Sequence, residues 1–476
     1  MKKRLHSIIC LLLVMLLTAS CGSGTSADTT ASEQDTLTAA PKMDRIAELG
    51  DHDFGGEAFV ILDAGADVNV NTPDDTLTGD LINDTIVRRN EIISELYNVS
   101  FEYVKIPNAN ERANMLRSSV MANEAAYDLL FAHLPDCIAP LATEGILADL
   151  CAIEPLSLDA NWWSPLVYES LQLGGKMYYS TGDISPISYR SPACYYANET
   201  LLDKYGISKD GIYSYVENGT WTLDVLKEYT KDLDIDLNED GTMYTDDDFF
   251  GVLNEDNTLT AACFMVAAGV NLSAIDGSGS LTADLGSEQV IHVIEKLKGI
   301  LSNAKRSGNP ALHAAFMEDR AVFVMHYAAS GYTRYRGLES DYLTLPLPKY
   351  DEKQETYRSL MSSWGNAFVC VPVTADADRA GVIMEAMAYW SHDNLRSAAY
   401  DVALKEKGSR NEKDAMMLDI LFNTLYLDFN SFMEFGGSLT PAANALFKDE
   451  AYASAYESIR EKMNAEMEEF AKAWIG

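Results

Sequence analysis

A short acidic stretch at 236–251, DLNEDGTMYTDDDFFG, has the spacing of a calcium-binding loop. Such loops place oxygen ligands at positions 1, 3 and 5, a glycine at 6, a backbone carbonyl at 7 and an acid at 12. The glycine is Gly241, and the predicted ligands are Asp236, Asn238, Asp240, Thr242 and Asp247. A turn without metal is the alternative, because Asp, Asn and Gly favour turns anyway. A single loop would be a static structural calcium site rather than a sensor, which needs paired helices that open.

Motifs typical of hydrolases and nucleotide-binding enzymes are missing from the sequence. It contains no GxSxG, HExxH or P-loop pattern, and its seven histidines are scattered rather than clustered as a catalytic zinc site requires. A glycoside hydrolase needs two carboxylates, but pairs are uninformative among 72 acidic residues. We therefore expect no enzyme and no required cofactor. A secreted glycan-active enzyme and a lipoprotein sensor or adhesin without transport stay open as alternatives.

The charge balance narrows the partners. The 476 residues include 36 basic and 72 acidic side chains, a net charge of -36. This excess argues against nucleic acid and disfavours an anionic ligand, although charge inside a cleft can differ from the total. A peptide or polyamine ligand stays open.

The hydrophobic fraction of 47% is ordinary for a globular protein, and the length suits two or three domains. We expect a monomer.

The N-terminus has the features of a bacterial export signal. The basic residues Lys2–Arg4 precede an apolar run, Ile8–Leu17, that is too short to span a membrane as a mature helix. The following LTASCGSG resembles a lipobox around Cys21. We predict a signal peptide over 1–20, a lipid on Cys21 that anchors the chain in the membrane, and a flexible tether over 21–54. The body would then lie on the extracytoplasmic face of the membrane.

The cysteines of the body do not form a framework. They are widely spread and include no CxxC, so they predict neither a set of disulfides nor a metal site. A bridge between Cys137 and Cys151 is left open. Cys263 and Cys370 lie in apolar runs and are expected in the core.

The first part of the body alternates strand and helix patterns. Apolar runs at 57–65, 100–106 and 127–134 predict strands, and the periodicity of 78–99 and 108–123 predicts helices between them. This β-α-β-α-β order favours a parallel sheet with helices on its faces. Ligands of such sheets bind beyond the carboxyl ends of the strands. The last part of the chain, 411–476, is predicted to be helical.

Several stretches, taken in order, resemble the extracellular solute-binding proteins of bacterial ABC importers, in particular the carbohydrate-binding family 1. They include YDLLFAHLPDCIAPLATEGILADL, NWWSPLVYESLQLGGKMYYSTGDIS, NGTWTLDVLKEYTKDL and SSWGNAFVCVPVTADADRA, and together they cover most of 57–400. The resemblance implies a two-lobed, periplasmic-binding-protein-like α/β fold of type II, with a hinge and a ligand cleft. It also implies a lipid-anchored protein that captures a mono- or oligosaccharide and delivers it to the permease subunits of an ABC importer.

Lobe boundaries follow from where the chain would cross between lobes. We expect crossings near Ile184–Ile187 and Lys349–Leu360, with a return near Asn309–Met317. Lobe 1 would then comprise 55–185 and 318–355, and lobe 2 would comprise 186–317 and 356–476.

A sugar site needs aromatic rings for the apolar faces of the sugar and polar side chains for its hydroxyl groups. Strand ends, crossings and exposed aromatics supply the candidates: Asp63, His133, Trp162, Trp163, Asp183, Arg190, Asn254, Glu255, Tyr327, Trp364 and Asn366. His133 can equally be a histidine satisfied within the fold, and of the two adjacent tryptophans one is expected to pack and one to face the cleft. Trp221, Trp390 and Trp474 are expected to be packing or lobe-surface residues.

Overall fold

A computed structural model describes residues 45–63, 71–73, 76–243, 247–301, 309–406 and 408–476. The chain from 45 onward belongs to one compact unit. The predicted signal peptide, the lipidation site Cys21 and most of the predicted tether lie outside the described residues.

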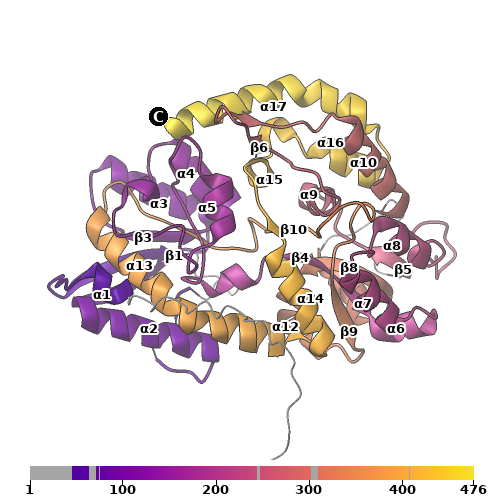
Figure 1. Ribbon diagram of the computed structural model, residues 1–476, viewed down its shortest axis with the longest axis horizontal. Coiled ribbons are helices and arrows are strands. Elements are labelled where there is room, and N and C mark those ends of the chain that lie inside the picture. The colour runs from indigo at the N-terminus through magenta and orange to yellow at the C-terminus, as the bar shows by residue number, and fades with distance from the viewer. Residues whose placement is uncertain (1–44, 64–70, 74–75, 244–246, 302–308, 407) are drawn as a thin grey trace, which may run out of the picture. The chain divides into compact units, whose positions relative to one another are not determined.

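The first of two four-stranded sheets is built mainly from the N-terminal part of the chain (Figure 1). Its strand order is β11-β3-β1-β2, with β1, β2 and β3 parallel and β11 antiparallel to β3. The strands are β1 (Glu57–Asp63), β2 (Val99–Lys105), β3 (Leu129–Ala132) and β11 (Phe368–Cys370). The helices α2 (Leu81–Tyr97) and α3 (Ala109–Met121) connect the parallel strands. The predicted β-α-β-α-β order is therefore confirmed.

Local signals in the sequence set the ends of these helices. The side chain of Asp80 accepts hydrogen bonds from the backbone of Ile82 and Asn83 at the start of α2, and Asn108 caps α3 through the amide of Glu111. Strand β3, inside the sheet, is apolar and every one of its residues is buried, whereas the edge strand β2 is only partly buried.

The second sheet has the order β5-β8-β4-β9. Strand β4 (Ala193–Asn198) pairs antiparallel with both β8 (Ala321–Tyr327) and β9 (Tyr342–Pro346), whereas β5 (Phe250–Leu253) runs parallel to β8. The helices that precede or follow these strands are α6 (Glu199–Lys204), α7 (Lys209–Glu217), α8 (Leu223–Thr230), α9 (Thr258–Ala267), α10 (Glu288–Leu301) and α11 (Asn309–Met317). We call the first sheet with its helices the first lobe, and the second sheet with its helices the second lobe.

The chain passes between the sheets at two places close to the expected ones. The short helix η3 (Pro186–Tyr189) leads from the first lobe into β4, and the segment after β10 (Ser359–Leu360) leads back into β11. After β11, the helix α13 (Ala377–Asp393) packs against α1 and α2, and the chain then runs through η5 (Ser397–Glu406) to α14 (Glu412–Asn423), which packs on β9.

The predicted lobe boundaries are wrong for several elements. Strands β8 and β9, expected in lobe 1, hydrogen-bond with β4 in the second sheet, and β11 and α13, expected in lobe 2, belong to the first. The helix α11 packs on β8 and is not a return crossing. A short, fully buried apolar strand fits either sheet, so its pairing partner is decided by the three-dimensional arrangement rather than by its own pattern.

The remaining elements are short, apart from the C-terminal helix. They are α1 (Arg45–Leu49), η1 (Leu134–Ile138), α4 (Ala139–Thr143), η2 (Leu150–Ala152), α5 (Pro165–Leu171), β6 (Ala274–Ile275), β7 (Leu281–Thr282), α12 (Ser330–Thr333), η4 (Tyr335–Gly337), β12 (Leu425–Tyr426), α15 (Asn430–Met433), η6 (Phe435–Gly437), α16 (Thr440–Lys448) and α17 (Tyr452–Ile475).

The helix α17 contacts both lobes (Figure 1). At its start, the Tyr452 hydroxyl donates to the carbonyl of Leu285 at 2.7 Å in the second lobe. At its end, the Tyr178 hydroxyl donates to the carbonyl of Trp474 at 2.8 Å in the first lobe. The C-terminal part is helical as predicted, but its last helix is shared between lobes.

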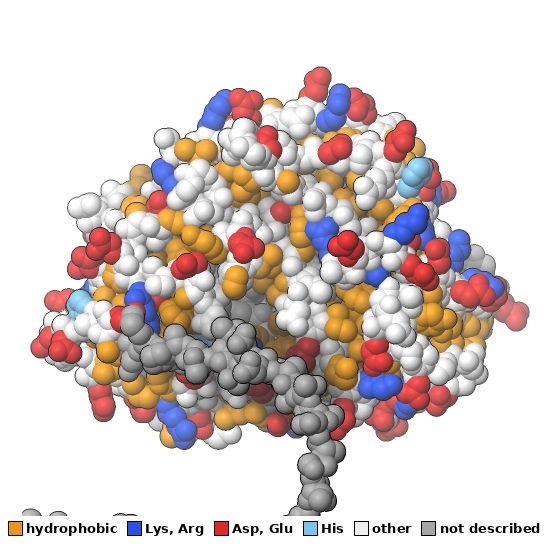
Figure 2. Space-filling view, in the orientation of Figure 1, with side chains coloured by type: hydrophobic (Ala, Val, Ile, Leu, Met, Phe, Trp, Pro, Cys, Tyr) orange, Lys and Arg blue, Asp and Glu red, His pale blue; other side chains and the backbone are white. Residues whose placement is uncertain are grey.

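The predicted tether is too long at its C-terminal end. Residues from Arg45 form α1, which packs on α13, and the Arg45 guanidinium donates to the carbonyl of Pro155 at 2.7 Å. Among the described residues, no helix is both long enough and apolar enough to span a bilayer. The acidic side chains are spread over the visible face of the protein rather than gathered in one patch (Figure 2).

The described residues contain no disulfide between cysteines. Cys137 is buried and Cys151 is exposed, and the bridge that the sequence left open is not formed. Cys263 and Cys370 are buried in the core as expected, and Trp221 and Trp474 are also core residues.

Candidate ligand-binding cleft

A cavity of about 450 Å³ lies where strands of both sheets end. His133 directly follows β3 of the first sheet, while Tyr327 ends β8 of the second. The lining residues are His133, Ile187, Arg190, His326, Tyr327, Ala329, Ser330, Thr333, Arg334, Trp364 and Gly365. The carboxyl ends of parallel strands are where α/β sheets bind ligands, and the volume suits a small molecule. The cavity therefore brings together four predicted residues: His133, Arg190, Tyr327 and Trp364.

Trp364 is the most exposed aromatic candidate. It precedes β11, and its side chain is 49% exposed although tryptophan is normally well buried. Its ring centroid lies 6.4 Å from that of His133. The turn that presents it is closed by Ser362, whose hydroxyl accepts from the amide of Gly365 at 2.9 Å. A half-exposed tryptophan face that lines the cavity is available for stacking.

His133 is oriented by a buried neighbour. Its Nδ1 lies 2.8 Å from the carbonyl oxygen of Asn366. Because a carbonyl only accepts, Nδ1 carries a proton in this bond, and in the neutral ring Nε2 is then an acceptor. The side chain of Asn366 is fully buried and accepts from the Thr181 hydroxyl at 3.3 Å. Asn366 thus positions His133 and does not line the cavity itself.

Tyr327, Asn254 and Glu255 lie at adjacent strand ends of the second sheet. Asn254 is fully buried, and neither of its side-chain polar atoms has a hydrogen-bond partner among the described residues. One carboxylate oxygen of Glu255 accepts from Asn257 at 2.7 Å, whereas the other is buried without a partner. Burial raises the pKa of Glu255, although the Arg334 charge acts in the opposite direction. Unlike Tyr327, neither residue lines the cavity.

Two arginines line the cavity, and the sequence singled out only one. Arg190 Nε donates to the Tyr332 hydroxyl at 3.1 Å. Arg334 follows α12 and is exposed. The cavity is also lined by Ser330, Thr333 and Arg334, which follow β8 in the chain. Tyr327 was chosen because it ends a strand, and extending that criterion to the residues after β8 would have identified these three as well.

Two buried histidines lie at this wall of the cavity; His326 lines it, and His313 packs behind His326. The rings of His313 and His326 are 4.5 Å apart, with Nδ1 of His326 bonded to the Ser330 hydroxyl and Nδ1 of His313 bonded to the Tyr335 hydroxyl, both at 2.6 Å. Burial and the Arg334 charge lower the pKa of His313 to about 4. Burial, His313 and Arg334 also lower the pKa of His326 well below its ordinary value. Both rings are therefore neutral at neutral pH.

Four predicted site residues have structural roles instead. The indole nitrogens of Trp162 and Trp163 donate to the buried carboxylate of Glu385 at 3.1 and 2.8 Å, so both tryptophans pack inside the first lobe. Asp63 is fully buried and accepts from the Thr72 hydroxyl. Asp183 is hydrogen-bonded to Tyr189 and His392. The carboxylates of Asp63 and Asp183 therefore accept hydrogen bonds from other side chains of the protein. Trp163 and Asp183 also line a smaller cavity of about 290 Å³.

The predicted calcium loop is folded through its own side chains. The amide of Gly241 donates to Asp236 at 2.8 Å, and Gly241 has the positive φ of +80° that such a turn requires. The Asn238 amide donates to Asp240 and Asp247 at 3.3 and 3.0 Å. The other Asp236 oxygen is buried without a partner, which suits a cation ligand. Nevertheless, no three His, Cys, Asp or Glu side chains in the described part of the chain group closely enough to hold a metal ion.

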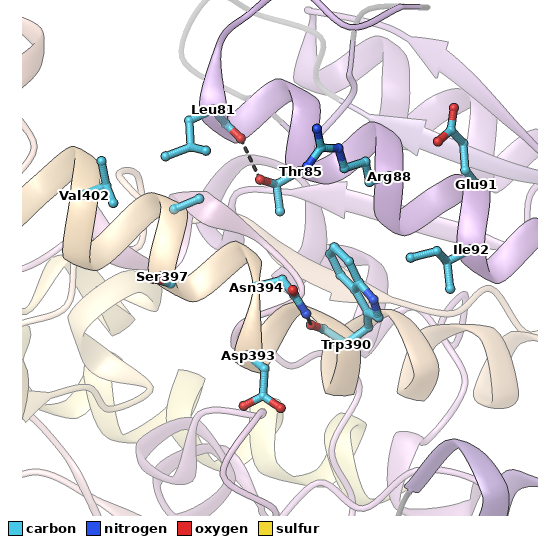
Figure 3. A pocket seen from close by; sticks show the side chains of 11 residues that line it. Leu81, Thr85, Arg88, Glu91, Ile92, Trp390, Asp393, Asn394, Ser397 and Val402 are labelled. Atoms are coloured by element: carbon cyan, nitrogen blue, oxygen red, sulfur yellow. Dashed lines mark hydrogen bonds between the residues drawn. The ribbon is translucent and has the colours of Figure 1, made fainter. Parts of the chain in front are cut away.

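A second groove lies on the outer side of the first lobe. It measures about 440 Å³ and runs between α2 and the segment from α13 into η5 (Figure 3). Trp390 points toward α2 there, next to Ile92 of that helix, while Leu81 lies at the other end of the groove. This groove is lined by helices alone, so it lacks the strand-end setting of the cleft.

Comparisons with solved structures agree with this architecture. A substrate-binding protein of an ABC transporter from Listeria monocytogenes, solved with cycloalternan, is 11% identical with a TM-score of 0.55, covering 87% of this chain and 99% of its own. A solute-binding protein from Thermotoga lettingae bound to α-D-tagatose is 15% identical with a TM-score of 0.55, covering 86% and 100%. The GacH receptor of Streptomyces glaucescens, solved unliganded and with acarbose, is 14% identical with a TM-score of 0.51, covering 88% and 97%.

The chain has the two-lobed fold of the ABC solute-binding proteins. No protein-family model matches it, and no curated protein matches it either. The predicted fold class is confirmed. The similarity is one of structure at low identity, and it spans nearly the whole of each neighbour.

Proposed function

We propose that this protein is a lipid-anchored extracellular solute-binding protein that captures a carbohydrate and delivers it to an ABC importer. The observation that carries the proposal is the cavity at the facing strand ends, which combines an exposed tryptophan with polar side chains from both lobes. The three structural neighbours were solved with cycloalternan, acarbose and tagatose. Their fold and ligands support a binding protein over an enzyme.

The mechanism is capture by bridging. A sugar stacked on Trp364 and hydrogen-bonded to His133 on one side can reach Tyr327 and Arg190 on the other. Such contacts are complete only when the lobes are close, so the ligand stabilises the closed arrangement by its differential affinity for it. A permease that binds the closed form would then receive only loaded protein.

The test is thermal unfolding in the presence of mono- and oligosaccharides, amino acids, peptides and polyamines. A ligand that binds only the folded chain raises the melting temperature by mass action. We expect a saturable shift with one class of sugar and no consumption of that sugar. A sugar that is consumed would identify an enzyme, and a panel without any shift would favour a sensor or adhesin.

The stacking residue can be tested with a matched pair. We expect Trp364→Ala to weaken sugar binding roughly tenfold or more, because it removes the aromatic face. Trp390→Ala removes an indole of the same kind from the outer groove and should leave the affinity unchanged. Equal affinities of both variants and the natural protein, measured by calorimetry, would show that the sugar binds elsewhere.

The membrane anchor and the metal are separate parts of the proposal. The lipid on Cys21 rests on the lipobox, and Cys21→Ser should release the protein from the membrane fraction. A structural calcium rests on the unpartnered oxygen of Asp236 and the turn at Gly241. Chelation should then lower the melting temperature without abolishing sugar binding, whereas a curve indifferent to calcium would reduce the loop to a turn.

A further inference from the structure

The cleft has a charge opposite to that of the protein as a whole. The chain carries a net charge of -36, yet the described lining of the cavity contains two arginines and no aspartate or glutamate. At physiological ionic strength charges are screened beyond roughly 8 Å. A bound ligand therefore experiences the nearby guanidinium groups much more than the distant acidic surface.

Arg334 is the cation whose surroundings are most informative. Among the described residues it forms no salt bridge and no side-chain hydrogen bond. Glu255 is the acid whose pKa it influences, but the buried free oxygen of that carboxylate has no hydrogen-bond partner, so the two groups do not form a contact ion pair. A guanidinium group that lines a cavity and has no carboxylate partner in the protein can bind a carboxylate of a ligand.

Arg190 supplies a second cation, from the crossing between the lobes. Its Nε is held by the hydroxyl of Tyr332, a residue of α12 that lies two positions before Arg334. Both arginines line the same cavity, so an anionic group bound there is close to two positively charged side chains. His326, which lines the cavity, and His313, which packs on it, are both neutral and add no charge of either sign.

The chemistry of guanidinium groups selects the ligand. Arginine presents planar donors that match a carboxylate or sulfate with two parallel hydrogen bonds, and charge-assisted bonds are about twice as strong as neutral ones. A neutral sugar hydroxyl uses only one donor at a time. We propose that the ligand is an acidic carbohydrate, whose carboxylate or sulfate is bound by Arg334 and Arg190 while a sugar face stacks on Trp364.

This inference rests on the proposed function and narrows it. It reverses the expectation drawn from the net charge, because the local lining rather than the total decides binding. The experiment is calorimetry with uronate oligosaccharides built from galacturonate, glucuronate and mannuronate, with the same oligosaccharides methyl-esterified at each carboxyl, and with sulfated disaccharides and their unsulfated forms. We expect one acidic member to bind about 10- to 100-fold more tightly than its neutral partner.

Two variants test the role of Arg334: Arg334→Gln itself, and Arg336→Gln as its control. Arg334→Gln should remove most of the preference for the acid and change the affinity for the neutral partner less than about threefold. Arg336→Gln changes an exposed arginine outside the cavity and should leave both affinities unaltered. Because both variants alter exposed side chains, both should fold.

The outcomes separate the two proposals. Preferential binding of a uronate or of a sulfated sugar supports the inference and tells the two anions apart. Binding of a neutral partner equal to or tighter than that of its acid, or an acid preference that survives Arg334→Gln, overturns the inference and leaves carbohydrate capture intact. If no carbohydrate of either kind binds, both proposals fail.

Discussion

A single buried carboxylate organises three segments of the first lobe. Glu385 of α13 is fully buried and accepts from Arg45, Trp162 and Trp163, with the backbone amide of Ser157 at 3.2 Å as a further donor. A buried charge is tolerated only when such donors surround it. Trp162 and Trp163, which the sequence suggested as sugar-stacking residues, are therefore held inside the lobe by their hydrogen bonds to Glu385.

We expect Glu385→Gln to lower the free energy of unfolding by roughly 2–4 kcal/mol, because it removes the charge that pairs with Arg45 and places amide donors against the indole donors. Urea unfolding followed by tryptophan fluorescence measures the change. Asp378→Asn on the exposed first turn of the same helix is the control and should change the stability by less than about 1 kcal/mol. Similar losses in the two variants would contradict the role of the network.

At the scale of elements, the helix α17 packs on both lobes and connects them. Its C-terminal turn buries Trp474 against Tyr178, Tyr179 and Phe429, with ring centroids 4.8 to 5.4 Å apart. Trp474 Nε1 also donates to the carbonyl of Lys176 at 3.1 Å. Since the start of the helix packs in the second lobe, closure of the cleft must occur with this helix attached on both sides.

Trp474→Ala should cost about 3–5 kcal/mol of stability, because it leaves a cavity among four aromatic rings. Ile475→Ala, at a neighbouring side chain that is 40% exposed, should cost less than about 1 kcal/mol. Thermal unfolding compares the two. A small effect of Trp474→Ala would mean that the end of α17 is not firmly docked on the first lobe.

At the scale of the whole molecule, two buried groups, His313 and Asp414, change the free energy of unfolding in opposite directions as the pH falls. The folded-state pKa of His313 is lowered to about 4, so between pH 6.5 and 4 the unfolded chain binds more protons and stability falls as the pH falls. Asp414 is hydrogen-bonded to Tyr213, and burial raises its pKa to about 6. Between pH 6 and 3.8 the folded chain therefore binds more protons at Asp414, and this contribution to stability rises as the pH falls.

The histidine contribution can be isolated by difference. We expect His313→Gln to become progressively more stable relative to the natural protein on going from pH 7 to pH 4, by up to about 3 kcal/mol. The exposed His292→Gln should show no such trend. Melting temperatures at a series of pH values measure both. A constant difference between His313→Gln and the natural protein would show that His313 is not held neutral by the fold.

The sequence by itself determined those features that depend on local patterns. The helical period of 78–99 and 108–123 and the apolar runs around them predict the α/β class and the first three parallel strands. Placing candidates at strand ends also found His133 and Tyr327, because the end of a strand can be located from the pattern of its own residues. Trp364 was found as an aromatic residue that precedes a strand.

The tertiary structure alone decided which segments share a sheet and which side chains are already occupied. Strands β8 and β11 are almost entirely buried, and their residue patterns do not identify the strands they pair with, so the predicted lobe boundaries were wrong. Trp162, Trp163 and Asp183 have the side chains of a sugar site, but their partners Glu385 and His392 lie about two hundred residues away in the sequence. The sign of the charge in the cleft is likewise set by spatial neighbours, because screening makes proximity, rather than the net charge of the chain, the quantity that a ligand meets.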